Sequence, residues 1–120
     1  MFNKVILIGN LGQDPEFKST GSSQFASFPL ATHTAWHDKR RGEKQDRTEW
    51  HRIVAWGKLA QTCRQHLEKG KMILVEGALK TTAINVGKSE DGVERLAYVT
   101  EVVASRIKIF PRAENQGGKK

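Results

Sequence analysis

The sequence predicts an all-β fold: five strands that close into a barrel, with one α-helix between the third and fourth strands. Segments of strand length recur along the chain, and glycine or polar clusters separate them. One segment alone has the spacing of an amphipathic helix. No repeat or linker divides the 120 residues, so we expect one domain over residues 1–110 and a short disordered basic tail over 111–120.

The predicted strands are each bounded by glycine, proline or charged residues. In chain order they span residues 3–11, 24–36, 48–56, 72–80 and 96–109. The helix is predicted over 58–68, with Gly70 in the position of a C-terminal cap. Two polar segments are predicted to be loops: the charged segment 37–47, and the segment 85–95, which we expect to be a mobile hairpin loop.

The first strand differs from the others because its apolar residues are continuous from Val5 to Ile8. A half-exposed strand alternates apolar and polar residues, so the continuous run predicts that both faces are covered. In a small single sheet, we expect another subunit to cover one of these faces. Val5 and Leu7 are therefore candidate subunit contacts.

Five strands with a single helix between the third and fourth is the order of the OB fold. The predicted architecture is thus a five-stranded OB-fold Greek-key barrel. In that fold, oligonucleotides bind to the second and third strands and to the loops that join strands 1–2 and 4–5. The aromatic and basic residues of this chain gather in those same places.

The charge balance points to a polyanionic partner. The 20 lysines and arginines exceed the 13 aspartates and glutamates and give a net charge of +7, with a pI of about 9.8. Nucleic acid is the first expectation and an anionic membrane surface the second. No apolar stretch approaches the roughly 20 residues of a membrane-spanning helix, and no signal peptide is recognisable. The single cysteine excludes an internal disulfide and suits a reducing compartment.

The three tryptophans, Trp36, Trp50 and Trp56, lie close together among lysines and arginines. Strand alternation puts Trp50, Arg52 and Trp56 on one face and Ile53 on the other. Rings that stack bases beside cations that follow phosphates favour binding of unpaired nucleic acid without sequence preference. The alternative is that both rings fill a core, although an arginine between them would be hard to bury. The residues alone leave both interpretations open.

No catalytic or metal constellation is predicted. His33 and His37 are four residues apart, but on a strand that spacing separates them by about 13 Å. Cys63 and His66 could suggest a nucleophile and a base, yet Cys63 lies on the apolar face of the predicted helix, where packing is the simpler role. We therefore expect no metal, no cofactor and no enzymatic activity.

Several segments resemble the bacterial-type single-stranded DNA-binding protein family. They span residues 3–16, 48–60, 67–70 and 75–79, in the family's order. The most specific is the block Thr48-Glu49-Trp50-His51-Arg52. The resemblance implies an OB-fold subunit that assembles into a homotetramer, with a dimer as the less favoured state, and wraps single-stranded DNA without sequence preference.

The resemblance also implies roles for individual residues. The base-stacking residues would be Trp36, Trp50 and Trp56, and the basic residues along the DNA path would be Arg52, Lys58, Lys69 and Lys80. His51 matches a histidine at a subunit contact, and the first strand matches the strand that forms the dimer. The implied setting is replication, recombination and repair of DNA in the cytoplasm, in the bacterial nucleoid or, for a phage or plasmid relative, in the host cell.

The chain departs from the family pattern in two places. Relatives usually continue after Thr81 with basic residues and a further tryptophan, whereas this chain has Thr82-Ala83-Ile84. We expect weaker binding or a different footprint there. Relatives also end in a long linker and an acidic tip that recruits replication and repair proteins, whereas this chain ends in Gly117-Gly118-Lys119-Lys120. Either the sequence is truncated there, or this is a phage or plasmid relative that does not recruit partners through such a tail.

Two other functions remain open at this stage. One is a related OB-fold protein of replication restart, which commonly works as a dimer and binds proteins as much as DNA. The other is an RNA-binding or anticodon-type OB module. The complete set of aromatic residues argues against the first, and a preference for structured RNA over oligo(dT) would reveal the second.

Overall fold

The computed structural model describes residues 1–111. Six strands and one helix make up this part of the chain. In chain order they are β1 (Val5–Leu11), β2 (Glu16–Thr20), β3 (Ser23–Asp38), β4 (Glu43–Trp56), α1 (Lys58–His66), β5 (Met72–Lys88) and β6 (Glu94–Ile109). The prediction of a mainly β chain with one helix between its third and fourth predicted strands is confirmed. The predicted tail, from residue 112 onward, lies outside the described residues.

The strands form one curved sheet in the order β1-β5-β6-β4-β3-β2, in which β1 also pairs with β3. The β1–β3 pairing covers only Asn10↔Ala31 and Leu11↔Leu30, and the β4–β6 pairing, which is parallel, is equally short. The expected closed barrel of five strands was therefore wrong. The sheet has six strands, because the short polar strand β2 pairs with β3 at its edge, and the barrel is not closed.

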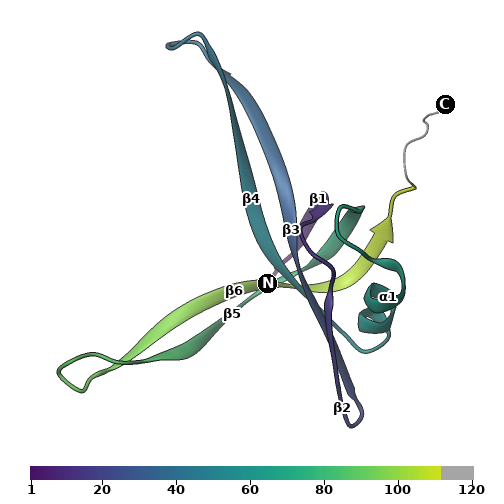
Figure 1. Ribbon diagram of the computed structural model, residues 1–120, viewed down its shortest axis with the longest axis vertical. Helices are drawn as coiled ribbons and strands as arrows, with labels where there is room; N and C mark the ends of the chain where they lie inside the picture. The colour runs from purple at the N-terminus through teal and green to yellow at the C-terminus, as the bar shows by residue number, and fades with distance from the viewer. Residues whose placement is uncertain (112–120) are drawn as a thin grey trace.

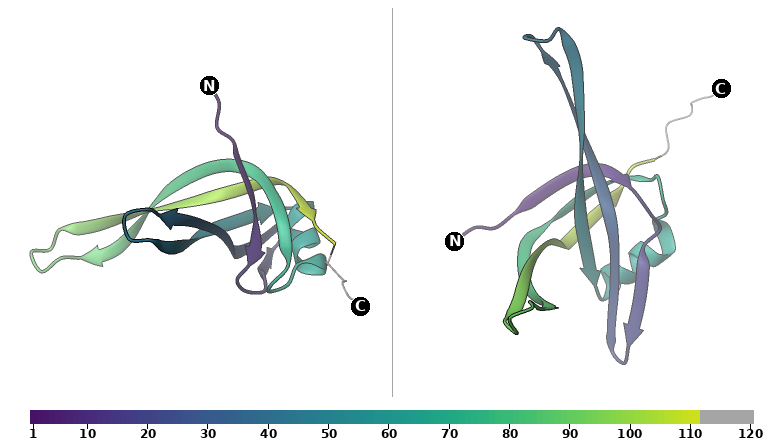
Figure 2. Two further views of the ribbon diagram at one scale, coloured as in Figure 1. Left: turned by 90° about the horizontal axis from the view of Figure 1, so that it is seen from above. Right: turned by 60° about the vertical axis from the view of Figure 1, so that its left-hand side comes forward.

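Two long two-stranded ribbons project from the curved part of the sheet (Figures 1 and 2). One is the outer part of β3 and β4, which stay paired as far as Asp38↔Glu43. The other is the outer part of β5 and β6, which stay paired as far as Lys88↔Glu94. The loops predicted over 37–47 and 85–95 were thus mostly wrong, because backbone pairing continues through these polar sequences to short turns.

The core lies between the inner face of the curved sheet and α1, which packs against β3 and β4. Its completely buried members include Leu30, Ile53 and Ile73 from the strands and Cys63 from the helix. Burial raises the pKa of the Cys63 thiol to about 11, so at neutral pH this side chain is a neutral apolar group, as the sequence predicted. The helix is too short to span a membrane, and no other helix occurs in residues 1–111.

The predicted helix is confirmed, but its C-terminal end differs from the expectation. The helix ends at His66, and the capping residue is Leu67, whose N–H donates to the Cys63 carbonyl at 3.0 Å. Gly70 comes later, with φ at 91°. Its N–H donates to the Leu11 carbonyl at 2.8 Å. Gly70 therefore ties the connection after the helix to the end of β1 and does not cap the helix.

The side chains of β1 are not oriented as the sequence analysis predicted. Val5 and Leu7 are half-buried and pack against the core. Ile6 and Ile8 point the other way and are exposed. The apolar surface that β1 offers to another subunit is therefore carried by Ile6 and Ile8, which the sequence interpretation did not select, while a contact through Val5 and Leu7 stays a prediction.

Candidate nucleic-acid interface

All three indoles are exposed. The side chains of Trp36, Trp50 and Trp56 are 47%, 58% and 53% accessible to solvent. A core position for these rings, the alternative that the sequence left open, is therefore excluded. Large aromatic groups exposed in this way are typical of binding surfaces.

The outer face of β4 carries Trp50, Arg52 and Trp56, as the alternation of the strand predicted. Ile53 and Ala55, between them in sequence, are completely buried on the inner face. Val54 shares the outer face but is only 2% exposed, where β4 pairs with β6. The outer face therefore offers two aromatic positions separated by a covered stretch, and not one continuous platform.

Trp56 has an aromatic neighbour on the adjacent strand. Its Cα partner is Phe25 of β3, and the two ring centroids are 4.7 Å apart with an interplanar angle of 57°. Lys58, the first residue of α1, follows Trp56 after Gly57 and is exposed. An exposed ring braced by a second ring and followed by a cation suits contact with a base and its phosphate.

Trp36 lies on the opposite face of the β3–β4 ribbon from Trp50. Paired residues of an antiparallel ladder share a face, and every second residue returns to it. Trp36 pairs with Gln45 and lies six residues from Leu30, so it shares the face that continues outward from the core. Trp50 pairs with Ala31, the residue after Leu30, so it lies on the opposite face of the ribbon. The third indole, whose face the sequence analysis did not assign, is therefore separated from the other two by the thickness of the ribbon.

Arg52 is held in place by an ion pair across strands. Its Nε lies 2.5 Å from Glu101 Oε2 on β6, and the two side chains are 49% and 20% exposed. Lys80 of β5 is the Cα partner of the same Glu101. Two of the predicted DNA-path residues are thus neighbours of Glu101: Arg52 through an ion pair, and Lys80 through its position on the adjacent strand.

A pocket of about 320 Å³ opens on the outer face beside Trp50 and Arg52. Phe28 and Pro29 of β3 line it, as do Asp14 from the β1–β2 connection and Glu16 of β2. The buried polar residue of the described chain, Ser27, also lies in this lining. The pocket therefore combines an exposed indole and a cation with apolar and hydrogen-bonding groups, a mixture that suits a ligand with both a flat ring and a charge.

The remaining predicted cation, Lys69, lies in the connection between α1 and β5. Its backbone N–H donates to Asp14 Oδ1 at 2.8 Å, which brings this connection beside the lining of the pocket. Its side chain is exposed. Lys69 therefore lies near the outer-face pocket, through the connection that contacts Asp14.

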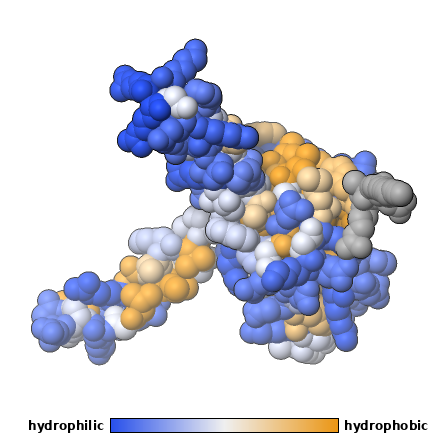
Figure 3. All heavy atoms as spheres, turned by 45° about the horizontal axis from the view of Figure 1, so that its top comes forward, coloured by the Kyte–Doolittle hydropathy of each residue, from blue (hydrophilic) through white to orange (hydrophobic). Residues whose placement is uncertain are grey.

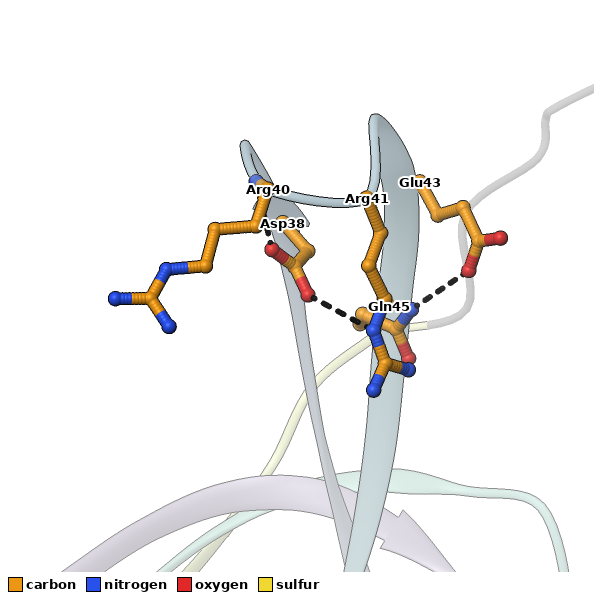
Figure 4. Close-up of polar contacts among 5 residues, drawn as sticks. All are labelled: Asp38, Arg40, Arg41, Glu43 and Gln45. Atoms are coloured by element: carbon orange, nitrogen blue, oxygen red, sulfur yellow. Dashed lines mark hydrogen bonds and ion pairs between the residues drawn. The ribbon is translucent and has the colours of Figure 1, made fainter.

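The tip of the β3–β4 ribbon holds cations that the sequence interpretation placed in a loop. Figure 4 shows that Asp38 accepts a hydrogen bond from the backbone N–H of Arg40 at 3.0 Å and lies 3.8 Å from Arg41 Nε. Gln45 donates to Glu43 at 3.3 Å. The guanidinium of Arg40 extends away from the hairpin. The tip is therefore a fixed turn that presents positive charge to solvent.

Two of the four histidines form side-chain hydrogen bonds. His51 is half-buried, with Nε2 2.8 Å from Thr32 Oγ1. His33 Nδ1 lies 3.3 Å from Thr48 Oγ1. Within residues 1–111, no group of three or more histidine, cysteine, aspartate or glutamate side chains gathers in a way that could hold a metal ion.

Comparison with known proteins identifies the family. Residues 2–110 match the single-strand binding protein family. The chain belongs to this family. A curated relative, single-stranded DNA-binding protein 1 of Chlorobaculum tepidum, is 44% identical over 117 residues, which are 97% of this chain and 69% of the relative. A solved structure, the Plasmodium falciparum SSB complex with ssDNA, matches with a TM-score of 0.81 and 29% identity over 92% of this chain and 97% of the other.

The predicted resemblance to this family is thus confirmed, and its OB-type fold is supported by the solved relative. The departure noted at Ile84 lies on the β5–β6 ribbon, where the exposed apolar side chains are Ile84, Val86, Val93, Leu96 and Tyr98. Figure 3 shows hydrophobic surface along this ribbon, whereas the β3–β4 ribbon is almost entirely hydrophilic. Ile84 also lines a small pocket with Arg52 and Glu101, so this ribbon reaches the same surface as β4.

Proposed function

We propose that this protein binds single-stranded DNA without regard to base sequence, by stacking bases on Trp36, Trp50 and Trp56 and by placing cations beside the phosphates. The observation that carries the proposal is the exposure of all three indoles on strands that also present Arg52 and the charged ribbon tip. Every base has a stacking face, so a surface of this kind needs no contact with base edges. Family membership and the DNA-bound solved relative support the same ligand.

The role of the cations is electrostatic. Each phosphate that a lysine or arginine neutralises releases condensed counterions, so binding weakens as salt rises, with a slope near −0.7 per phosphate on single strands. Lys58, Lys69 and Lys80 act in this way beside the outer face, together with Arg52. The protein performs no covalent chemistry in this scheme and needs no cofactor or metal.

The proposed assembly is a homotetramer of such subunits, with β1 and His51 at subunit contacts. The exposed Ile6 and Ile8 support a contact through the outer face of β1. Wrapping of DNA around the assembly would shield strands that are exposed during replication, recombination and repair, in the cytoplasm where the chromosome lies.

A fluorescence titration with oligo(dT) of increasing length, at two salt concentrations, tests the proposal. We expect quenching of tryptophan emission that saturates at a defined length and an affinity that falls steeply with salt. Tighter binding to structured RNA than to oligo(dT) would contradict the proposed ligand. A native mass of two subunits would replace the tetramer by the dimer of the restart-type relatives.

A further inference from the structure

Three of the nine glycines in the described chain do not adopt a backbone conformation that requires glycine. The other six have φ between 57° and 112° and therefore adopt a conformation that disfavours side chains; they are Gly21, Gly42, Gly57, Gly70, Gly87 and Gly92. Gly9, Gly12 and Gly77 lack a positive φ. At these three positions, glycine is instead explained by the lack of room for a side chain.

Gly12 differs from the other two in what surrounds it. A Cβ at Gly9 would lie 2.1 Å from the Ala31 carbonyl oxygen, and one at Gly77 would lie 2.2 Å from the Val103 carbonyl oxygen. These two positions are needed for close packing of strands. A Cβ at Gly12 would instead meet the six-membered ring of the Trp50 indole, 2.4 Å from Cζ3 and 2.8 Å from Cη2.

The backbone segments that carry this contact are both fixed to β3. The Gly12 N–H donates to the Pro29 carbonyl at 3.0 Å, and Trp50 pairs with Ala31, two residues farther along β3. The Pro29 ring is also close, with Cγ 3.5 Å from the position of a Gly12 Cβ. The indole therefore crosses β3 from β4, and its far edge lies against the β1–β2 connection.

We propose that Gly12 is a positioning residue that sets the place of the Trp50 indole and thereby one wall of the outer-face pocket. The inference rests on the proposed function, because it assigns this wall to the stacking of a base. One edge of the ring is packed against Gly12, while the side chain as a whole stays 58% exposed. A ring held at its edge loses less freedom when a base stacks on its face, which favours binding.

A methyl group at residue 12 would move the indole and leave the backbone in place. Gly12 has no positive φ, so its backbone does not require glycine. The contacted atoms are at the far end of the Trp50 side chain, which is 58% exposed. We expect Gly12→Ala to fold and to bind oligo(dT) at least about fivefold more weakly, since base–aromatic stacking contributes severalfold or more to affinity.

A double-mutant cycle tests the inference. Trp50→Phe keeps an aromatic ring but removes the outer ring atoms that reach Gly12. Gly12→Ala should weaken binding at least about fivefold when residue 50 is tryptophan, and less than about twofold in the Trp50→Phe background. An equal loss in both backgrounds, or no loss beside Trp50, would overturn the positioning role and leave the proposed function intact. Trp50→Ala supplies the separate check: if it binds oligo(dT) as well as the unmodified protein, Trp50 stacking fails and the inference fails with it.

A spectroscopic readout separates positioning from a general loss of structure. In a chain with Trp36→Phe and Trp56→Phe, emission reports Trp50 alone, and Gly12→Ala should make this indole more accessible to acrylamide with the circular dichroism unchanged. Unchanged quenching would overturn the proposal. Should Gly12→Ala not fold, restored folding in the double variant with Trp50→Phe would support the contact, and a double variant that also fails to fold would assign Gly12 to the backbone and overturn it.

Discussion

The two ribbons that project from the sheet are alike in backbone and opposite in surface chemistry. Both are antiparallel pairs that continue beyond the core to a short turn. The β3–β4 ribbon carries Trp36 and a tip rich in arginine, whereas the β5–β6 ribbon carries exposed aliphatic side chains and Tyr98. The comparison teaches that the pairing of the backbone sets the reach of a ribbon, and that its side chains decide what the ribbon can bind.

The largest expected effect comes from the base of the β3–β4 ribbon. Trp50→Ala should weaken oligo(dT) binding by roughly 1–3 kcal/mol for each base that stacks there. Tyr98→Ala on the other ribbon, which removes an even more exposed ring (70%), is the matched control and should change the affinity little. Titration of both variants under one salt condition checks this, and equal losses would remove the distinction between the ribbons.

The opposite orientation of Trp36 gives the next effect. Because Trp36 and Trp50 lie on different faces of one ribbon, a short oligonucleotide that occupies the Trp50 face does not reach Trp36. Trp36→Ala should therefore leave the affinity for short oligo(dT) unchanged and weaken binding by about 1 kcal/mol or more once the strand is long enough to contact both faces. Titration across a series of lengths shows the crossover. A loss that is independent of length would place both rings on one binding path.

A gain of binding should be obtainable on the β5–β6 ribbon. Ile84 is 45% exposed and lines a pocket with Arg52 and Glu101. Ile84→Trp would add a stacking surface beside an existing cation and should strengthen oligo(dT) binding by about 1 kcal/mol. Ile84→Leu is the control of similar size without a stacking ring. If the tryptophan variant gains no more than the leucine variant, the strand does not pass this ribbon.

The smallest effect concerns the charged tip of the β3–β4 ribbon. Arg40→Gln removes a guanidinium that extends into solvent, while its backbone contact with Asp38 is retained. If Arg40 neutralises one phosphate, the slope of log affinity against log salt should become shallower by about 0.7. Arg106→Gln provides the comparison, because Arg106 lies on β6 and forms an ion pair at 3.4 Å with Glu76 of β5. A slope unchanged in Arg40→Gln would leave the tip without a phosphate contact.

Local patterns in the sequence were sufficient for the part of the site that lies on one strand. Alternation alone put Trp50 and Arg52 outside and Ile53 inside, as the structure has them. Trp36 could not be placed in the same way. Its face depends on the register across the hairpin, which is set by where the turn between Asp38 and Glu43 falls. Gly42, with φ at 67°, lies in this turn, but a glycine in a charged segment does not by itself fix how many residues the turn contains.

The errors in the fold have a related cause. Residues 16–20 and the segments around the turns of both ribbons are rich in polar residues, so their composition resembles that of loops, although each pairs with the neighbouring arm of its own hairpin. Composition does not carry that information. A continuous apolar run does not show which of its alternating side chains face the subunit's own core, so Val5 and Leu7 were selected for the subunit contact. The exposed side chains of this run are Ile6 and Ile8.

The short parallel pairing of β4 with β6 bears on how the chain folds. Ile53 and Val54 meet Val102 and Val103, so this seam joins segments that are far apart in sequence and can form only when nearly all of the described chain has been synthesised. Contacts of such long range slow folding. We therefore expect the β2–β3 and β3–β4 hairpins to form before the seam during synthesis.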